Sequence, residues 1–282
     1  MTLNIQKPIK VNNFSEINEK YDSIICDIWG VIHNGQELFS SSVECLLKYK
    51  KIGYPVILVS NAPRPGNEIK LILKNMGLDE QCYDRIITSG DLTQTILNKK
   101  ELGSRCYHIG PDRDLNVFEG VDVERVEFDD ADFIFVTGLF DDKTENDESY
   151  LPLLEVGKKR GLKLLCANPD IWVQRGKDLI PCAGAISEKY KSIGGETINI
   201  GKPFSPIFDE AMVLIKEISN NTSVSTIVIG DGIDTDIKGA NNYNLDSLLV
   251  LGGLFSGQKN KDIFDSMNKK NIFPTYYIGK LV

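Results

Sequence analysis

The sequence has only two histidines and no CxxC pair, and none of its apolar runs is as long as a membrane span. Its six cysteines are scattered, and several lie inside apolar runs, which is typical of buried free thiols. The first residues, 1–22, are polar and dotted with lysines, so we expect no signal peptide. Free thiols without a disulfide pattern favour a cytoplasmic location.

An excess of basic charge is also lacking. The net charge is −8, from 32 basic and 40 acidic residues, so little would displace counterions from nucleic acid. A phosphorylated small molecule is not excluded, because a few local cations and a metal can hold one. Hydrophobic residues make up 41% of the 282 residues, which is enough for a sizeable core in one large domain or two ordinary ones.

Residues 24–35, near the N-terminus, carry the pattern from which the rest of the sequence is interpreted. Three apolar residues lead to Asp27, and Gly30 and Gly35 mark the loop that follows. This pattern predicts a buried strand of a parallel sheet that ends in a carboxylate. Ligands of such sheets bind beyond the carboxyl ends of the strands, so Asp27 is a candidate nucleophile or metal ligand. An isolated Asp more often starts a turn, so the interpretation depends on residues further along.

Strands and helices alternate in both outer thirds of the chain, as in βαβ units with a parallel sheet. The predicted strands there lie at residues 54–60, 86–89, 197–200, 225–230 and 247–251, and the helices at 40–53, 65–77, 236–243 and from 205. The middle third shows a second alternation, with strands at 105–109, 132–137 and 162–167 and helices at 91–98 and 147–160. We therefore predict an α/β core of residues 1–88 and 191–282 and an inserted α/β domain of residues 89–190.

Four of the predicted strands end in polar side chains. These are Asp27, then Ser60 and Asn61, then Lys202, and lastly Asp231 with Asp234 and Asp236. In one parallel sheet all four ends would emerge at the same edge, although each alone is more often an ordinary turn. Together they provide carboxylates, hydroxyl and amide donors and one cation, a set that suits Mg²⁺-assisted phosphoryl transfer.

The chain resembles the haloacid dehalogenase (HAD) superfamily in four motifs, which occur in the family's order. They are Asp27-Ile-Trp-Gly-Val, Val59-Ser-Asn61, Gly201-Lys-Pro203 and Gly230-Asp-Gly-Ile-Asp-Thr-Asp236. Ser60-Asn-Ala-Pro-Arg64 and Ala167-Asn-Pro-Asp170 are similar to segments of its NagD-like branch, subfamily IIA. The resemblance covers about residues 21–254. It implies a Rossmann-like parallel-sheet core with an inserted α/β cap of the C2 type.

The resemblance also implies roles for the matching residues. Asp27 would attack phosphorus and form an aspartyl-phosphate. Ser60 and Asn61 would hold the phosphate oxygens, and Lys202 would neutralise the nucleophile and the phosphate.

A metal site is implied in the same way. Asp27, Asp231 and the backbone carbonyl of Trp29 would bind Mg²⁺, and Asp236 would steady the water molecules of the metal. Asp234 occupies a variable position of the motif and carries less weight.

Further residues are implied near the entrance of the site. Asn168 and Asp170, just before the chain returns from the cap to the core, would contact the entrance. Arg64 would either contact an anion or lie at the surface, and both interpretations stay open.

Trp29 departs from the family pattern. Two residues after the nucleophile, family phosphatases have an aspartate that protonates the leaving oxygen and then activates water. An indole donates a hydrogen bond but does not exchange protons near neutral pH. Loss of a general acid–base lowers the rate by about 10² to 10⁴.

Three interpretations of function follow. The protein is a phosphatase, slowed or rescued by another group such as His33 in the Asp27 loop, although His33 is more often a satisfied loop residue. Alternatively, it binds Mg²⁺ and a phosphorylated ligand without turnover, as a sensor or scaffold. A dehalogenase is least favoured, because those enzymes work without the metal that Asp231 and Asp236 would hold. His108, near the end of a predicted strand, is expected to be structural.

The favoured function is Mg²⁺-dependent hydrolysis of a small phosphate monoester, such as a sugar phosphate. The site is expected in a cleft between core and cap, whose closure would exclude water. We expect a small phosphorylated metabolite as partner, and neither nucleic acid nor a membrane. A homodimer is compatible with the sequence because cap surfaces can pair, but no residue marks an interface.

Overall fold

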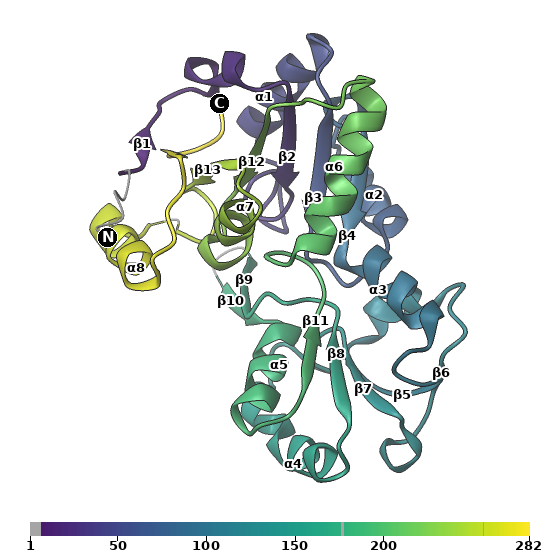
Figure 1. Ribbon diagram of the computed structural model, residues 1–282. Helices are drawn as coiled ribbons and strands as arrows, with labels where there is room; N and C mark the ends of the chain where they lie inside the picture. Colours follow the sequence, from purple (N-terminus) through teal and green to yellow (C-terminus); the bar gives the residue numbers. More distant parts are fainter. Residues whose placement is uncertain (1–6, 176–177, 256) are drawn as a thin grey trace. The chain divides into compact units, whose positions relative to one another are not determined.

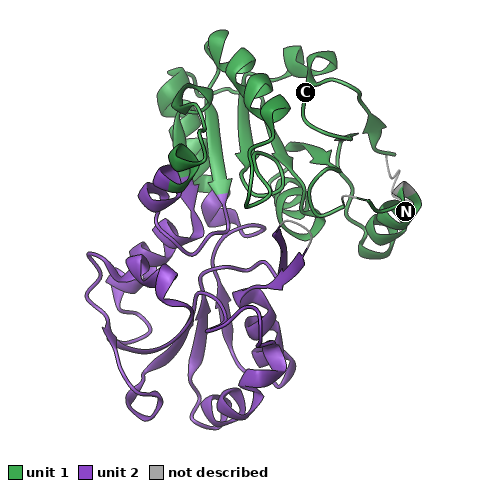
Figure 2. Cartoon of the chain, turned by 180° about the vertical axis from the view of Figure 1, so that it is seen from behind, with its two compact units in different colours: residues 1–59, 72–86, 208–282 green, residues 60–71, 87–207 purple. Residues whose placement is uncertain are grey.

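The computed structural model describes residues 7–175, 178–255 and 257–282 (Figure 1). The chain divides into two compact units (Figure 2). Unit 1 comprises residues 1–59, 72–86 and 208–282, and unit 2 comprises residues 60–71 and 87–207. Each unit is built around its own β-sheet, so the α/β class predicted from the sequence is confirmed. The predicted domain boundaries near residues 88 and 190 rest on motif order and stay a prediction.

A seven-stranded sheet with the order β1-β14-β13-β12-β2-β3-β4 forms the centre of unit 1. Its strands are β1 (Ile9–Lys10), β2 (Ser23–Asp27), β3 (Val56–Ser60), β4 (Arg85–Thr88), β12 (Thr226–Gly230), β13 (Asp246–Val250) and β14 (Tyr276–Ile278). β2 pairs in parallel with β12 on one side and β3 on the other. All residues of these three strands are buried, which explains their continuous apolar runs.

The register of β2 with its neighbours places the ends of the strands next to each other. Cys26 pairs with Ile229 of β12, and Asp27 pairs with Val59 of β3. Asp231, two residues beyond Ile229, therefore follows the end of β12 beside the end of β2. The parallel pairing thus brings together residues that are about 200 positions apart in the chain.

The helices that accompany this sheet are α1 (Ser40–Lys51), α2 (Gly66–Asn75), α6 (Ser205–Ser219), α7 (Lys238–Asn242) and α8 (Asn260–Lys270). α1 and α2 are followed by Gly53 and Gly77, the residues at which the two predicted helices end, and their φ angles of 88° and 90° favour glycine. The helix predicted from residue 236 begins earlier, because a π-helical turn, η7 (Ile233–Ile237), precedes α7.

Unit 2 contains a five-stranded parallel sheet with the order β11-β8-β7-β5-β6. Its strands are β5 (Arg105–Ile109), β6 (Glu124–Arg125), β7 (Phe133–Val136), β8 (Lys163–Cys166) and β11 (Thr197–Asn199). Its α-helices are α3 (Ser89–Lys99), α4 (Leu151–Lys159) and α5 (Ala183–Ser192). β9 (Trp172–Arg175) and β10 (Asp178–Pro181) form a separate antiparallel pair. Short 3₁₀ segments include η4 (Asp112–Phe118) and η6 (Asp147–Tyr150).

Alternating residues of β7 build the two faces of this second sheet. Ile134 and Val136 belong to one buried apolar cluster, together with residues of α4 and α5. Phe133 and Phe135 belong to another, together with Leu97 of α3. Because successive side chains of a strand point to opposite faces, a single apolar run supplies both cores. This is the three-layer packing expected of an α/β sheet with helices on both faces.

The prediction that all four polar strand ends share one sheet is wrong for β11. This strand pairs with β8 in the sheet of unit 2, with Thr197 opposite Leu164. The sequence of β11 is compatible with either sheet, and its backbone hydrogen bonds to β8 place it in the sheet of unit 2.

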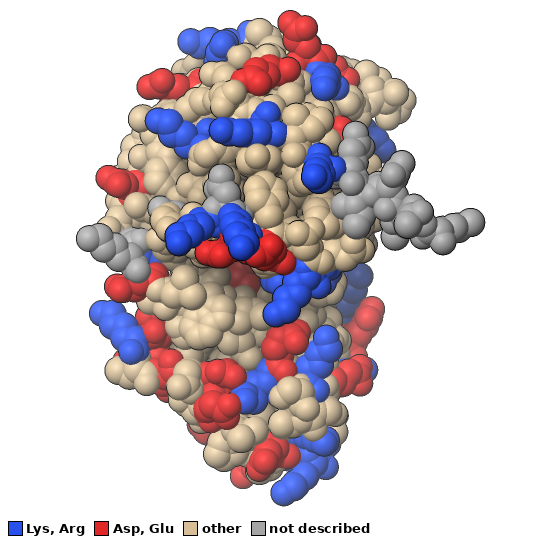
Figure 3. All heavy atoms as spheres, turned by 90° about the vertical axis from the view of Figure 1, so that its left-hand side faces the viewer, with Lys and Arg blue, Asp and Glu red and all other residues tan. Residues whose placement is uncertain are grey.

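Two sequence-based expectations concern thiols and charge. None of the six cysteines, all of which lie in the described residues, forms a disulfide, and five of them are buried, as predicted. On the face drawn in Figure 3, basic and acidic side chains are interspersed rather than gathered by sign. Among the described residues, no helix combines the length and the apolar character needed to cross a membrane.

Candidate active site

Three buried aspartates meet at the end of the seven-stranded sheet. Asp27 ends β2, Asp231 follows β12, and Asp236 lies in the π-helical turn η7. Each offers one carboxylate oxygen, and these three oxygens lie within 4.8 Å of one another. The order of motifs in the sequence predicted this set, and the structure brings its members together.

Glycines surround the three carboxylates closely. A Cβ atom at Gly30 or at Gly253 would lie 1.9 Å from Asp231 Oδ2, and one at Gly230 would lie 2.1 Å from Asp236 Cγ. Gly30 also has a φ of 88°, a conformation that disfavours other residues. Any side chain at these positions would displace an aspartate. The glycines of the first and fourth motifs therefore leave room for the carboxylates.

The carboxylate cluster fits a divalent cation. Three buried carboxylates at this separation repel one another unless a positive charge compensates them. Backbone N–H groups supply part of that compensation: Leu254 donates to Asp231 Oδ2 (2.7 Å) and Gly232 donates to Asp236 Oδ2 (3.1 Å). Oxygen ligands of this kind are those that hard cations such as Mg²⁺ and Ca²⁺ prefer.

Trp29 is half-buried and is held by the loop that follows Asp27. Its ring packs edge-on against His33, with 4.9 Å between the ring centroids. Gly35 lies against the indole, because a Cβ there would be 2.6 Å from Trp29 Cη2. The Gly35 N–H donates to His33 Nδ1 (2.9 Å), so this nitrogen acts as a hydrogen-bond acceptor. Trp29, His33 and Gly35 thus support one another within the loop.

In unit 2, Asn61 links two segments of the predicted site. Its side chain donates from Nδ2 to Asp170 Oδ1 (2.8 Å) and to the Lys202 carbonyl (3.1 Å). Its Oδ1 accepts a hydrogen bond from the Lys202 N–H (2.7 Å). Gly201 is required beside it, because a Cβ there would lie 2.5 Å from Asn61 Oδ1. Asn61 therefore holds the backbone of the Gly-Lys-Pro segment in place.

We expect Asn61→Ala to lower the free energy of unfolding by about 2 to 4 kcal/mol, because the buried N–H and C=O of Lys202 lose their partner. Urea unfolding monitored by circular dichroism measures this change. Asn221→Ala is the matched control, since Asn221 Oδ1 accepts from Ser223 N–H in an exposed loop. Equal stability of the two variants would show that Asn61 has no such role.

The remaining predicted residues of unit 2 lie as follows. Ser60 Oγ accepts a hydrogen bond from the Ala62 N–H (3.1 Å), and Lys202 is buried. Asn168 Oδ1 accepts from the Asp170 N–H (3.1 Å), which orders the turn that presents Asp170 to Asn61. Arg64 Nε lies 3.4 Å from Asp114 Oδ1, a buried carboxylate that the sequence did not single out.

His108 has a packing role in β5. Its Nε2 contacts Thr137 Oγ1 (2.9 Å), and its ring packs against Phe118 and Phe135. Burial lowers the pKa of His108 from 6.5 to about 4, with Arg125 adding to the effect.

This depressed pKa predicts a pH-dependent stability. The unfolded chain binds a proton at His108 more readily than the folded protein does, so acid favours unfolding. Stability is fully present above pH 6.5 and is lost as the pH falls toward 4. We expect a loss of about 2 kcal/mol from His108 between about pH 7.5 and 5. Urea unfolding of wild type and His108→Gln at both pH values measures it, and identical pH dependences would contradict it.

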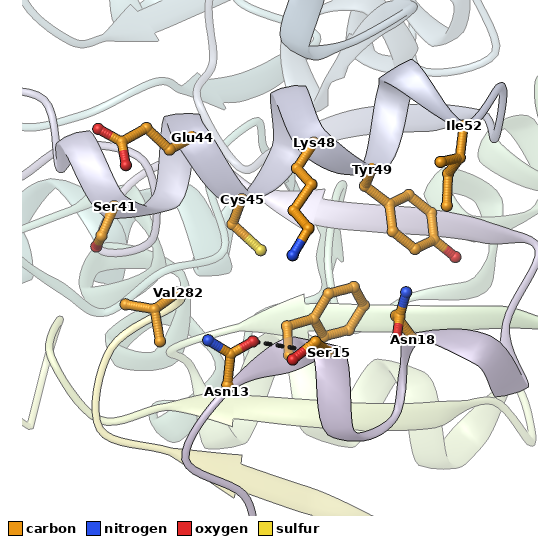
Figure 4. A pocket seen from close by; sticks show the side chains of 11 residues that line it. Asn13, Ser15, Asn18, Ser41, Glu44, Cys45, Lys48, Tyr49, Ile52 and Val282 are labelled. Carbon is orange, nitrogen blue, oxygen red and sulfur yellow. Dashed lines mark hydrogen bonds between the residues drawn. The ribbon is translucent and has the colours of Figure 1, made fainter.

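A cavity of about 380 Å³ lies elsewhere in unit 1 (Figure 4). It is lined by α1, the N-terminal 3₁₀ segments and the last residue, and none of the three aspartates contributes to it. Cys45 and Lys48 project into it from α1 (Figure 4). Burial raises the pKa of the Cys45 thiol to about 11, so this thiol stays protonated near neutral pH. Because none of the three aspartates lines it, the cavity is not part of the carboxylate cluster.

Comparison with known proteins assigns the family. Residues 24–124 match the model described as haloacid dehalogenase-like hydrolase, and residues 199–279 match the model of HAD-hydrolase-like proteins. A haloacid dehalogenase-like hydrolase from Brucella suis 1330 is 36% identical, with a TM-score of 0.88 over 96% of this chain and 100% of that one. The chain belongs to the haloacid dehalogenase-like hydrolases, in the NagD-like branch of subfamily IIA.

More distant relatives carry names that indicate activities. An acid sugar phosphatase of Staphylococcus saprophyticus is 25% identical over 92% of this chain and 94% of its own length. The glycerol phosphate phosphatase of Mycobacterium tuberculosis, solved in complex with calcium, is 24% identical, with a TM-score of 0.63. That comparison covers 84% of this chain and 68% of the mycobacterial one. At this identity, the mycobacterial structure supports the fold alone.

Proposed function

We propose that this protein is a Mg²⁺-dependent phosphatase that hydrolyses a small phosphate monoester, such as a sugar phosphate. The observation that carries the proposal is the cluster of Asp27, Asp231 and Asp236, whose buried carboxylate oxygens lie within 4.8 Å of one another. The relative named acid sugar phosphatase supports the same reaction class. The proposed partner is accordingly a small phosphorylated metabolite, and the proposed location of the protein is the cytoplasm.

The proposed reaction begins at Asp27. A carboxylate oxygen of Asp27 attacks phosphorus, the ester P–O bond breaks, and an aspartyl-phosphate forms. Water then hydrolyses this intermediate and restores the carboxylate. Ser60 and Asn61 are proposed to orient the phosphate oxygens, and Lys202 to balance their negative charge. Asn61 would do so through its backbone N–H, because both of its side-chain N–H groups donate to Asp170 and Lys202.

Asp27, Asp231 and Asp236 are the side chains proposed to hold Mg²⁺, with the Trp29 carbonyl as a further ligand. A bound divalent cation would supply positive charge at the phosphoryl oxygens. The glycines packed against Asp231 and Asp236 leave room for the two carboxylates at the end of the sheet. Residues 89–190 are proposed to act as the C2-type cap that restricts access of water to the reacting group.

The leaving oxygen needs a proton that Trp29 does not supply. A second candidate function is therefore binding of Mg²⁺ and a phosphorylated ligand without turnover. The packing of the Trp29 indole against His33 and Gly35 favours it, because the structure holds the non-titrating side chain in place. A dehalogenase is disfavoured, since a cation-binding carboxylate cluster has no use in that reaction.

Metal removal tests the proposed function. We expect p-nitrophenyl phosphate to be hydrolysed in the presence of Mg²⁺, and EDTA to reduce the rate to background, because the three carboxylates then repel the phosphate. Added Mg²⁺ in excess of EDTA should restore the rate. The measurement is release of p-nitrophenolate, and a full rate in EDTA would contradict the metal requirement. Binding of inorganic phosphate that requires Mg²⁺, without turnover, would favour the second function.

A further inference from the structure

Three arginines from separate segments of unit 2 gather around two carboxylates. Arg113 Nη2 lies 2.7 Å from Asp142 Oδ2, and Arg175 contacts both oxygens of the same carboxylate at 3.0 and 3.4 Å. Arg64 Nε lies 3.4 Å from Asp114 Oδ1. Arg64 follows β3, Arg113 lies in η4, and Arg175 ends β9. We call Arg64, Arg113 and Arg175 the arginine cluster.

The donors of this cluster outnumber its acceptors. Asp142 shares one negative charge between two guanidinium groups. Arg64 Nε is buried and makes no hydrogen bond within the described part of the chain. A buried donor without an acceptor destabilises a protein by about 1 to 3 kcal/mol. Because Arg64 Nε is closed to solvent, the donors that can reach an anion are the terminal Nη groups of the three arginines.

The carboxylate beside Arg64 is itself engaged. The Thr137 hydroxyl hydrogen-bonds the Asp114 carboxyl, and Asp114 is almost fully buried. Burial raises the pKa of Asp114, while Arg64 and Arg113 oppose that rise. Burial also lowers the pKa of the Arg64 guanidinium. Burial thus disfavours the charged forms that set the pKa of each side chain, while their mutual contact favours them.

We propose that the arginine cluster binds a second anionic group of the phosphorylated substrate, either a carboxylate or a second phosphate. Guanidinium groups present N–H pairs that match the paired oxygens of such anions. The inference rests on the proposed function and narrows its substrate class to phosphate monoesters with a second negative group. The side chains remain reachable, since Arg64 is 25% and Arg113 48% exposed.

The chain itself limits the size of that substrate. Arg64 lies three residues beyond Asn61, which is proposed to orient the phosphate, so their Cα atoms are at most about 11 Å apart. Asp170 accepts a hydrogen bond from Asn61 and lies five residues before Arg175, the last residue of β9. A molecule of a few carbon atoms could present one anion to each site.

Two matched probes test the proposal. 2-Phosphoglycolate carries a phosphate and a carboxylate, whereas ethyl phosphate has the same carbon number and only the phosphate. We expect wild type to show a kcat/KM for 2-phosphoglycolate about 10- to 100-fold higher, the scale of one charge-assisted hydrogen bond. Arg64→Gln should bring this ratio close to one. Arg105→Gln is the control, because Arg105 forms a comparable pair with Asp132 at the surface.

A preference for 2-phosphoglycolate over ethyl phosphate that is lost in Arg64→Gln and kept in Arg105→Gln supports anion binding by the arginine cluster. A wild-type enzyme that does not distinguish the two probes overturns it. Arg64→Lys keeps the charge without the paired donors and should show an intermediate ratio. Circular dichroism verifies folding, and Arg175→Gln replaces Arg64→Gln should the latter not fold.

A binding measurement tests the arginine cluster independently of the proposed phosphatase activity. If neither phosphate ester is hydrolysed, the phosphatase proposal fails. Calorimetric titration with malonate in the presence of EDTA then tests whether the arginine cluster binds an anion. Weaker malonate binding by Arg64→Gln than by wild type and Arg105→Gln supports it. Equal binding by all three proteins, or no binding by any, overturns it.

Discussion

Asp27→Asn is expected to reduce kcat for p-nitrophenyl phosphate by about 10³ to 10⁶, the range found when a catalytic nucleophile is removed. An amide does not attack phosphorus, so no aspartyl-phosphate forms. The substitution preserves the size of the side chain, so Asp231 and Asp236 should keep their positions. Initial rates at saturating substrate and Mg²⁺ provide the measurement. This result would also exclude binding without turnover.

The control for this experiment is Asp265→Asn. Asp265 is exposed on α8 and belongs to no part of the carboxylate cluster. The control should retain the wild-type rate, which shows that loss of one negative charge elsewhere has no effect. Unchanged activity of Asp27→Asn would remove Asp27 as nucleophile and with it the proposed mechanism.

Trp29→Asp is expected to raise kcat by about 10² to 10⁴, which is the usual contribution of a positioned general acid–base. The carboxyl group would occupy the position at which family phosphatases carry their proton donor. Because the indole is half-buried and packs against His33 and Gly35, a smaller side chain also leaves space there. The rates of both proteins over a range of pH measure the gain.

Trp29→Asn separates the two effects of that substitution. It leaves the same space as Asp but exchanges no proton, so its rate should remain near that of wild type. Equal gains in both variants would mean that the indole only obstructs the substrate. No gain in Trp29→Asp would indicate that another group already supplies the proton. A wild type without turnover, together with turnover in Trp29→Asp, would favour the binding function.

Several elements could be predicted because their residues repeat a simple pattern. The bounds of β5 are those predicted, and β3 and β12 lie within the predicted runs. These strands are buried on both faces, so their sequences are continuously apolar. The helix α6 begins at Ser205, as its Ser-Pro start predicted.

Other elements had no such pattern. The helix α5 begins with small residues, and Gly184 packs against the carbonyls of Pro169 and Asp170, so close packing replaces an apolar stripe. The hairpin β9–β10 is only partly buried and shows no clear alternation. α8 lies beyond the last motif, where neither a strand end nor a family segment marks it.

The sequence alone determined the chemistry of the carboxylate cluster. Asp27, Asp231 and Asp236 could be named as one set because their motifs follow predicted strands, and parallel strands end at a common edge. The sequence also indicated the family through the order of four motifs, and the comparisons with known proteins confirmed it. Both inferences use information that is local in the chain, namely a short pattern and its spacing.

Tertiary structure alone decided which residues surround that chemistry. It showed that β11 pairs with β8, that Asn61 holds the Lys202 backbone, and that Arg113 and Arg175 share Asp142. These contacts join segments that are far apart in the chain, and no local pattern encodes which distant partner a polar group will meet. The hydrogen bonds and ion pairs of the folded chain select those partners.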